Sequence, residues 1–448
     1  MLGPGPGPWT RRAANSIDGV ITAADQRILQ ECHGLYSNRQ HGLLQIGRSL
    51  GLLLLPPRKK INVMIMGNHS SGKSTFINWY VEEHIQKTGV AIETQGFTFV
   101  TSGQRREYLT GSATLHLYSH FRPLLEFQGV SNYLTTKISS SKQRKFSLVM
   151  FIDTPGLVDG DMNYPFDVNN VFVWLGEQAD LIFVFFDPMG QALCKRTLNV
   201  VERLNVTSGK KMHFYLSKAD EAGGTTDRQK VLMQIVQELC RRSGLNKCGF
   251  ELQTVYIPTS NTSGHGMNHI GEMCKIIEKT INETVQNTLN QLEKDCSLIT
   301  ETITDKLTQD SETVMVNTKA RIKSIICKVL GIFLPTFFAL SFVLTTLSRH
   351  LLQKLLNERI LDVLLTCVNF VIAMWDWMPE DLQFCTLLVC AGISALFILQ
   401  SRFYSRMCPT LSRKERRRMG EWRAFMEEIV KPKKNQLFEE YLRQRAAE

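Results

Sequence analysis

Residues 67–75 read GNHSSGKST and satisfy the phosphate-binding pattern G-x-x-x-x-G-K-[ST]. The apolar run INVMIM (61–66) before this loop predicts a buried strand, and FINWYVEEHI (76–85) after it predicts a helix. A strand that turns through glycines into a helix N-terminus directs several N–H groups and the helix dipole at one point. The sequence therefore predicts a phosphate site. Its residues are Gly67, Asn68, His69, Ser70, Ser71, Gly72, Lys73, Ser74 and Thr75.

Four residues of this loop have expected roles. Gly67 and Gly72 let the backbone curl around the β-phosphate without a Cβ in the way. Lys73 reaches the β- and γ-phosphate oxygens, and Ser74 gives its hydroxyl to Mg²⁺. The alternative is a Gly/Ser-rich loop that matches by accident, and the flanking strand and helix argue against it.

A second apolar strand, FSLVMFIDTPG (146–156), ends in Asp-x-x-Gly. In a P-loop nucleotidase Asp153 would hold Mg²⁺, and the Gly156 N–H would face the γ-phosphate. Such a domain also needs a threonine that closes on the metal, and the segment 90–103 offers Thr94 and Thr98. An ordinary surface threonine is the competing reading of either residue.

A third strand, MHFYLSKAD (212–220), ends in Ser217, Lys218 and Asp220. Asp220 is placed to accept two hydrogen bonds from a guanine ring, and Lys218 to pack over its face. Each motif alone is weak, but three at the ends of apolar strands predict a nucleotide switch domain. Strands that alternate with helical segments predict an α/β fold with a mostly parallel sheet.

The length of 448 residues exceeds one domain. The net charge of +10 is concentrated in 402–434, which holds eleven Lys or Arg against four Glu, so no general nucleic-acid surface is expected. Eleven cysteines without a C-x-x-C pair favour a reducing compartment. Residues 1–16 are expected to be disordered and 17–60 helical, with LGLLLL (50–55) as a helix end packed on the nucleotide-binding domain.

Several stretches together resemble the G domain of the EH-domain ATPases and sarcalumenin, a branch of the dynamin superfamily. These are GNHSSGKSTFIN, ETQGFTF, DTPG followed by YPFDVNNVFVWLGEQADLIFVFFDP, and LSKAD, within roughly residues 25–260. The resemblance implies that Ser70 orients the attacking water, and that Thr94 is the switch threonine. It also implies catalytic or metal roles for Lys73, Ser74, Asp153 and Gly156, base contacts from Lys218 and Asp220, and G-domain pairing in a homodimer.

Two departures bear on the substrate. Ser217 stands where the family usually has Asn, which weakens the guanine-reading motif, and the EH-domain relatives prefer ATP. GTP is favoured and ATP stays open. The expected G domain covers 61–270.

The second half departs from that branch. Residues 271–328 predict a helical stalk with apolar residues at alternating spacings of four and three, namely Val285, Leu289, Leu292, Cys296, Ile299 and Ile303. Packing on the chain's own domain and an intermolecular coiled coil are equally compatible with this seam.

Two charge-free runs follow, at 329–347 and 384–401, each close to the length that spans a bilayer. They predict a two-span transmembrane hairpin at 329–401, with buried soluble helices as the alternative. Basic flanks and an acidic loop (348–383) place both termini in the cytosol. The apolar stretch 360–377 is expected to be interfacial or re-entrant.

The tail, 402–448, is expected to form a basic amphipathic helix on anionic lipid, with a merely solvated cationic tail as the alternative. Its apolar face would comprise Met419, Trp422, Phe425, Met426 and Ile429.

The predicted function is that of a membrane-anchored, dynamin-like hydrolase of GTP or ATP with Mg²⁺ as cofactor. It would tether, fuse or remodel an intracellular membrane, with lipids and a second copy of itself as partners and no nucleic acid. The rival function is a membrane-tethered switch that recruits effectors without remodelling.

Overall fold

The structure is a computed structural model that describes residues 16–38, 41–89, 96–159, 164–188, 194–220, 225–242, 245, 252–258, 267–346, 366, 370, 373–375 and 377–446. The chain divides into two compact units. One comprises residues 1–297 and 427–448, and the other comprises 298–426.

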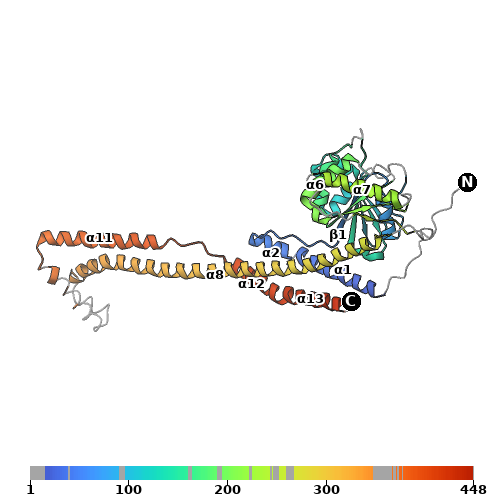
Figure 1. Ribbon diagram of the computed structural model, residues 1–448. Coiled ribbons are helices and arrows are strands. Elements are labelled where there is room, and N and C mark those ends of the chain that lie inside the picture. The colour runs from blue at the N-terminus through green and yellow to red at the C-terminus, as the bar shows by residue number, and fades with distance from the viewer. Residues whose placement is uncertain are drawn as a thin grey trace. The chain divides into compact units, whose positions relative to one another are not determined.

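The first unit contains a sheet of eight strands among the described residues, in the order β3-β4-β2-β5-β1-β6-β7-β8 (Figure 1). Five of the seven strand pairings are parallel; β2 with β5 and β3 with β4 are antiparallel. The prediction of a mostly parallel sheet is therefore confirmed. The strands are β1 (Ile61–Gly67), β2 (Phe97–Ser102), β3 (Glu107–Thr110), β4 (Leu134–Ser139), β5 (Val149–Asp153), β6 (Leu181–Phe186), β7 (Met212–Leu216) and β8 (Gln253–Thr254).

Helices cover both faces of this sheet. On one face Phe76 of α3 (Lys73–Val81) packs edge-on against Phe151 and Phe185, at ring-centroid distances of 6.2 and 5.9 Å. On the other face α5 (Val168–Gln178) and α6 (Lys195–Ser208) join the apolar core that includes Ile182. The remaining elements of the domain are α4 (Gly111–Leu117), α7 (Thr225–Arg241) and the 3₁₀ turns Ser119–Glu126, Val130–Tyr133, Gln143–Leu148 and Gly209–Lys211.

Two strands, β3 and β4, lie in residues 104–145, where the sequence pattern predicted none. β4 reads LTTKIS and β3 reads EYLT, so neither has the continuous apolar run of a buried parallel strand. Thr136 is nevertheless fully buried. Its hydroxyl lies 2.9 Å from that of Thr114 on α4, and this hydrogen bond compensates for the loss of water. Hydroxyl pairing of this kind is not visible in a periodicity.

Three helices pack together in the first unit. They are α1 (Ser16–Ser37), the first part of α8 (Ile270–Thr346) and α13 (Lys431–Ala446), and Figure 1 shows them running side by side. The buried Tyr36 hydroxyl of α1 donates to Asp295 of α8 at 2.6 Å. Lys434 of α13 binds Glu293 at 2.8 Å, and Lys433 binds Glu31 of α1 at 2.6 Å.

The seam on α8 faces the inside of the protein. All six of its residues are buried, five of them completely. Of the two packings that the sequence allowed, the structure has the one in which the seam packs within its own chain.

The short helix α2 (Leu43–Leu50) corrects one expectation. It ends at Gly51, whose φ of +85° is the left-handed conformation of a helix C-cap. The following leucines do not continue the helix, and Leu53 and Leu55 are 100% and 83% exposed. The prediction of a packed helix end at 50–55 is therefore wrong beyond Leu50.

The second unit contains the rest of α8, α11 (Glu380–Tyr404) and α12 (Arg413–Phe425). α8 and α11 include the two predicted apolar runs as far as residue 346, and α8 continues through Pro335 without a break. The predicted interfacial stretch 360–377 and loop 348–383 lie largely outside the described residues.

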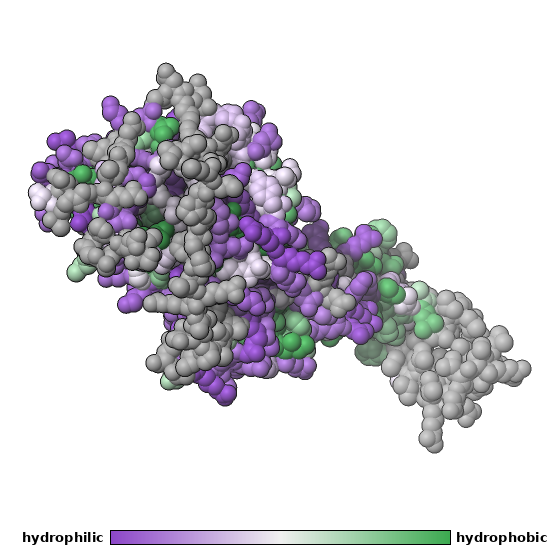
Figure 2. All heavy atoms as spheres, turned by 90° about the vertical axis from the view of Figure 1, so that its right-hand side faces the viewer, coloured by the Kyte–Doolittle hydropathy of each residue, from purple (hydrophilic) through white to green (hydrophobic). Residues whose placement is uncertain are grey.

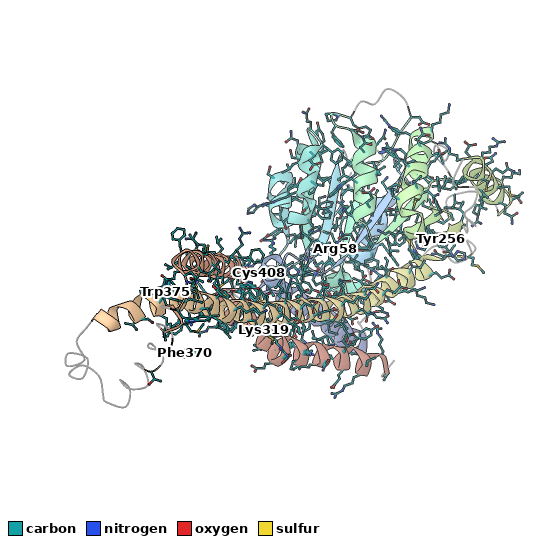
Figure 3. The ribbon with its side chains drawn as sticks, turned by 90° about the vertical axis from the view of Figure 1, so that its left-hand side faces the viewer. Arg58, Tyr256, Lys319, Phe370, Trp375 and Cys408 are labelled. Carbon is teal, nitrogen blue, oxygen red and sulfur yellow. The ribbon has the colours of Figure 1, made fainter. Side chains whose placement is uncertain are left out.

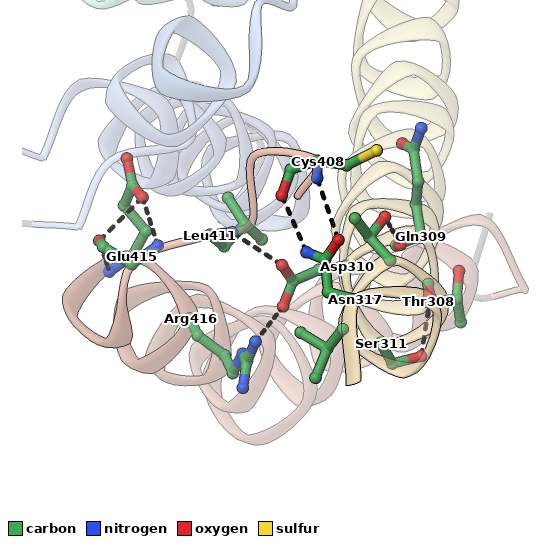
Figure 4. A network of polar contacts seen from close by, with 12 residues as sticks. Thr308, Gln309, Asp310, Ser311, Asn317, Cys408, Leu411, Glu415 and Arg416 are labelled. Atoms are coloured by element: carbon green, nitrogen blue, oxygen red, sulfur yellow. Dashed lines mark hydrogen bonds and ion pairs between the residues drawn. The ribbon is translucent and has the colours of Figure 1, made fainter. Parts of the chain in front are cut away.

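Polar contacts within this unit fix the segment that joins α11 to α12 (Figure 4). Asn317 of α8 exchanges two hydrogen bonds with the backbone of Cys408, at 2.9 and 3.0 Å. The buried Asp310 accepts the Leu411 N–H at 2.7 Å and binds Arg416. Ser412 and Glu415 form a capping box at the start of α12.

The tail also departs from the expectation. Its apolar side chains are mostly buried in protein, with Met419 and Trp422 each 8% exposed and Met426 fully buried, while Ile429 is 53% exposed. A π-helical turn, Met426–Val430, leads into α13, which packs on α1. The predicted lipid-facing amphipathic helix is therefore wrong for most of this face, because the same stripe has a protein partner.

Candidate nucleotide site

The phosphate loop lies between β1 and α3, where the sequence predicted it. Gly67 has a φ of +151°, and a Cβ there would lie 2.3 Å from the Phe185 carbonyl oxygen. Gly72 caps α3 with a φ of +81°. Ser70 also has a positive φ, +59°, which is uncommon for a residue with a side chain. These conformations wrap the backbone around the start of the helix.

Lys73 is folded into this loop and buried. Its Nζ donates to the carbonyl oxygens of Asn68 at 2.8 Å and Gly67 at 3.3 Å. Burial lowers the pKa of Lys73 to about 8, and the charge of Asp153 opposes that shift. The ammonium group is thus held at the loop by weak carbonyl partners, which a phosphate oxygen would replace with a charge-assisted bond.

Asp153 ends β5 and is fully buried. Its Oδ2 accepts from the Ser74 hydroxyl and from the Gln86 side-chain amide, both at 2.7 Å. Its Oδ1 has no hydrogen-bond partner among the described residues. Burial raises the pKa of Asp153, although Lys73, Ser74 and Gln86 each act in the opposite direction.

These groups fit Mg²⁺ and a phosphate. A buried carboxylate oxygen without a partner, next to a serine hydroxyl, is the hard oxygen pair that Mg²⁺ prefers. The Ser71 hydroxyl is likewise buried without a partner in the described chain. Of the three predicted metal ligands, Ser74 and Asp153 lie together, and Thr94 lies outside the described residues.

The alternative threonine, Thr98, is the second residue of β2 and the register partner of Asp153. Its hydroxyl lies 3.1 Å from that of Thr135 on β4. Thr98 also lines a cavity of about 630 Å³ together with Gln86, Lys137 and Arg106. In this conformation its hydroxyl is thus engaged with the neighbouring strand.

The Asp-x-x-Gly loop is joined to the phosphate loop through the backbone. The Leu157 N–H donates to the Gly67 carbonyl at 3.2 Å, and the His69 N–H donates to the Leu157 carbonyl at 3.1 Å. A Cβ on Gly156 would lie 2.6 Å from the His69 Cα. The Asp-x-x-Gly loop and the phosphate loop are therefore in direct contact.

A second cavity, of about 310 Å³, lies beside the start of α3. It is lined by Thr75 and Phe76 of α3, by Asp220 after β7, and by Tyr256 after β8. Of these residues, Tyr256 is labelled in Figure 3. This volume lies at the lower end of the range for small-ligand sites and accommodates a purine base. The predicted base-binding residues Ser217 and Lys218 also line it.

Two of these residues are engaged with neighbouring strands. The Ser217 hydroxyl donates to the Phe186 carbonyl at 3.1 Å, so it ties β7 to β6. The Lys218 Nζ forms an ion pair with Asp187 at 3.2 Å.

Sequence reasoning missed Tyr256 and Gln86. Tyr256 stands just after β8, as Lys218 stands just after β7, and parallel strands end at the same edge of the sheet. That position was a usable signal. Gln86 had none, because its role depends on how the residues after α3 fold back towards Asp153.

Comparison with known proteins gives consistent results. Residues 63–218 match the model of the dynamin family. The chain is 26% identical over 245 residues to EH domain-containing protein 2 of Arabidopsis thaliana, which covers 52% of this chain and 43% of that protein. It is 26% identical over 167 residues to human EH domain-containing protein 3, covering 36% of this chain and 30% of that one.

The matched region is therefore less than half of the length of these curated relatives. A solved structure of an oligomerised bacterial dynamin pair covers 97% of this chain and 81% of its own, at 12% identity and a TM-score of 0.41. That similarity is too low to carry an argument about this chain.

Proposed function

Because the chain carries a G domain of the dynamin superfamily, we propose that it is a membrane-anchored nucleotidase that hydrolyses GTP to tether, fuse or remodel an intracellular membrane. The observation that supports nucleotide hydrolysis is the group formed by Lys73, Ser74 and Asp153. It joins a cation, a hydroxyl and an unpartnered carboxylate oxygen at a helix N-terminus.

The residues divide the work. Lys73 leaves its carbonyl partners for the phosphates, and the loop amides between Gly67 and Ser74 bind the β-phosphate. Ser74 and Asp153 would hold Mg²⁺, and the bound ion would supply positive charge next to the phosphates. The contacts between Gly156, Leu157 and the phosphate loop make the second switch sensitive to the γ-phosphate. Ser70 as the residue that orients water, and Thr94 as the switch threonine, stay predictions.

The proposal of a membrane anchor rests on two helices of the second unit that expose apolar side chains and bury polar ones. The most apolar windows of α8 and α11 have mean hydropathies of 1.9 and 2.3, with only 17% and 6% of their residues buried. Their outward side chains include Phe333, Leu388 and Leu396, which are 59%, 58% and 65% exposed. Green apolar residues accordingly gather around these helices in Figure 2.

The buried side of the same helices is polar. Ser324 and Ser401 are buried, and each hydroxyl donates to the other residue's carbonyl at 2.9 Å. A water-soluble helix pair buries its apolar side chains and exposes its hydroxyls. A pair with the opposite arrangement suits lipid, where small and hydroxylated residues mediate helix packing.

The packing of α13 on α1 supports an even number of crossings. Residues near both ends of the described chain share one helical bundle, with ion pairs from Glu31 to Lys433 and from Arg27 to Glu440. Both ends therefore lie on one side of the membrane, with the nucleotide-binding domain on the cytosolic side. Exposed basic residues on α12 offer contacts to anionic lipid.

The test measures turnover of GTP and ATP by the full-length protein in detergent and in liposomes, alongside carbonate extraction from cells. Remodelling predicts Mg²⁺-dependent hydrolysis that rises with liposomes, and dimerisation with a transition-state analogue. The rival, a switch that recruits effectors, predicts slow hydrolysis unaffected by lipid. Recovery of the protein in the soluble fraction would refute the anchor.

A further inference from the structure

Gln86 lies outside the motifs, yet its side chain enters the metal site. The residue is 3% exposed, and its Nε2 donates to Asp153 Oδ2 at 2.7 Å. Ser74 donates to the same oxygen from the other side. Two donors on Oδ2 leave Oδ1 as the carboxylate oxygen without a partner among the described residues.

The backbone of Gln86 is fixed by one side chain of α3. Asn78 is 6% exposed, and its Oδ1 accepts the N–H groups of Ile85 and Gln86 at 3.1 and 2.8 Å. Its Nδ2 donates to the Gln86 carbonyl at 2.8 Å. A single amide thus satisfies both backbone groups of Gln86, as a neighbouring strand would do.

The residues before Gln86 are held in the same way. The His84 carbonyl accepts from Arg106 at 3.3 Å, and the Ile85 carbonyl accepts from Lys137 at 3.2 Å. Three successive carbonyls, from 84 to 86, are therefore each bound by a different side chain. This segment is not part of the sheet, so these side chains determine its position.

We propose that Gln86 is a positioning residue of the Mg²⁺ site: it fixes the Asp153 carboxylate so that Oδ1 serves the metal shell, and Asn78 holds Gln86 in place. Ser74 and Asn78 lie four residues apart on α3 and hence on one face. The helix that begins at the phosphate loop therefore reaches Asp153 twice, directly and through Gln86. Residues that orient a metal ligand typically contribute ten- to hundredfold to metal affinity.

The inference rests on the proposed nucleotide function. The experiment uses full-length protein loaded with a fluorescent guanine nucleotide, and measures nucleotide release over a Mg²⁺ titration and in excess EDTA. Gln86→Leu, of similar volume, should raise the Mg²⁺ concentration for half-maximal retention about tenfold and leave release in EDTA unchanged. Asn78→Ala should shift it similarly, and Asn78→Asp, which keeps the two acceptor contacts, should shift it less.

Asn62→Leu is the matched control. Asn62 is also a buried amide, 1% exposed, but it lies at the opposite end of β1 and donates to the Gln178 carbonyl. It should lower the melting temperature without moving the Mg²⁺ midpoint. An unchanged midpoint in Gln86→Leu, or an equal shift in Asn62→Leu, would overturn the positioning role alone. If nucleotide release from the wild-type protein did not depend on the Mg²⁺ concentration, the proposed nucleotide function would be overturned as well.

Discussion

A Cβ on Gly156 would lie 2.6 Å from the Cα of His69, so the Asp-x-x-Gly loop touches the phosphate loop at a position where only glycine fits. The hydrogen bonds of Leu157 to Gly67 and His69 continue this contact along the backbone. A movement of one loop therefore requires a movement of the other.

Gly156→Ala should separate these loops. We expect nucleotide turnover to fall at least about tenfold. The free energy of unfolding should also fall by about 1–3 kcal/mol, because the added methyl group would clash with the His69 backbone. Steady-state kinetics and denaturant unfolding measure both effects. Gly34→Ala is the control, since a Cβ there meets nothing within 4 Å. Wild-type turnover in Gly156→Ala would contradict the coupling of the two loops.

Lys73→Ala should weaken nucleotide binding by about a hundredfold or more, because it removes charge-assisted bonds to two phosphates. Ser74→Asn should instead raise the Mg²⁺ requirement, since it replaces the hydroxyl that contacts Asp153. Calorimetry with GTP in the presence of Mg²⁺ and in EDTA separates the two effects. Retention of wild-type affinity by Lys73→Ala would refute the phosphate assignment.

Asp220→Asn should lower GTP affinity about ten- to hundredfold and change ATP affinity little. The reason is that the carboxylate can accept two hydrogen bonds from the N–H groups of guanine, a pair of donors that adenine lacks. Tyr256→Ala should weaken both nucleotides, since it removes a wall of the 310 Å³ cavity. Competition binding with the two nucleotides measures the ratio. If Asp220→Asn leaves that ratio unchanged, the base is read elsewhere or ATP is the native substrate.

Gly331→Leu should separate α8 from α11. A Cβ on Gly331 would already lie 3.0 Å from Ile398 Cγ1 and 3.2 Å from the Ser394 carbonyl oxygen. We expect a cysteine pair at positions 324 and 401 to lose most of its cross-linking in membranes. Gly392→Leu is the matched control on α11, because a Cβ there meets nothing within 4 Å. Equal cross-linking in the two variants would show that the helices are not paired as described.

Asp310→Asn should loosen the segment between α11 and α12. The Leu411 N–H, followed by Arg416, lowers the pKa of Asp310. A lowered folded-state pKa means that the contribution to stability is complete above the ordinary carboxyl pKa of about 4 and is lost as the pH falls through the lowered value. Amide exchange at Leu411 should therefore be faster in the variant at pH 7. Asp305→Asn, on an exposed part of α8, should leave that exchange unchanged.

The sequence predicted those parts whose pattern is local. β1, β5, β6 and β7 are predominantly apolar, and Lys73, Asp153 and Asp220 lie at or after their ends, so the fold class could be predicted and the candidate site residues named without coordinates. Gln86 could not, because its role arises from Asn78 and a fold-back of the chain. The tail was misread for a related reason, since an amphipathic stripe such as Met419, Trp422 and Met426 has the same period whether it faces lipid or protein.

The partnership of α1 with α13 sets an order of events during synthesis. α1 is synthesised before α13, so the lysines that pair with its acidic side chains, such as Lys433 with Glu31, follow it along the chain. The contacts between α1 and α13 can therefore form only after α13 has been synthesised. We expect a chain that stops before α13 to leave the α13-facing side of α1 uncovered.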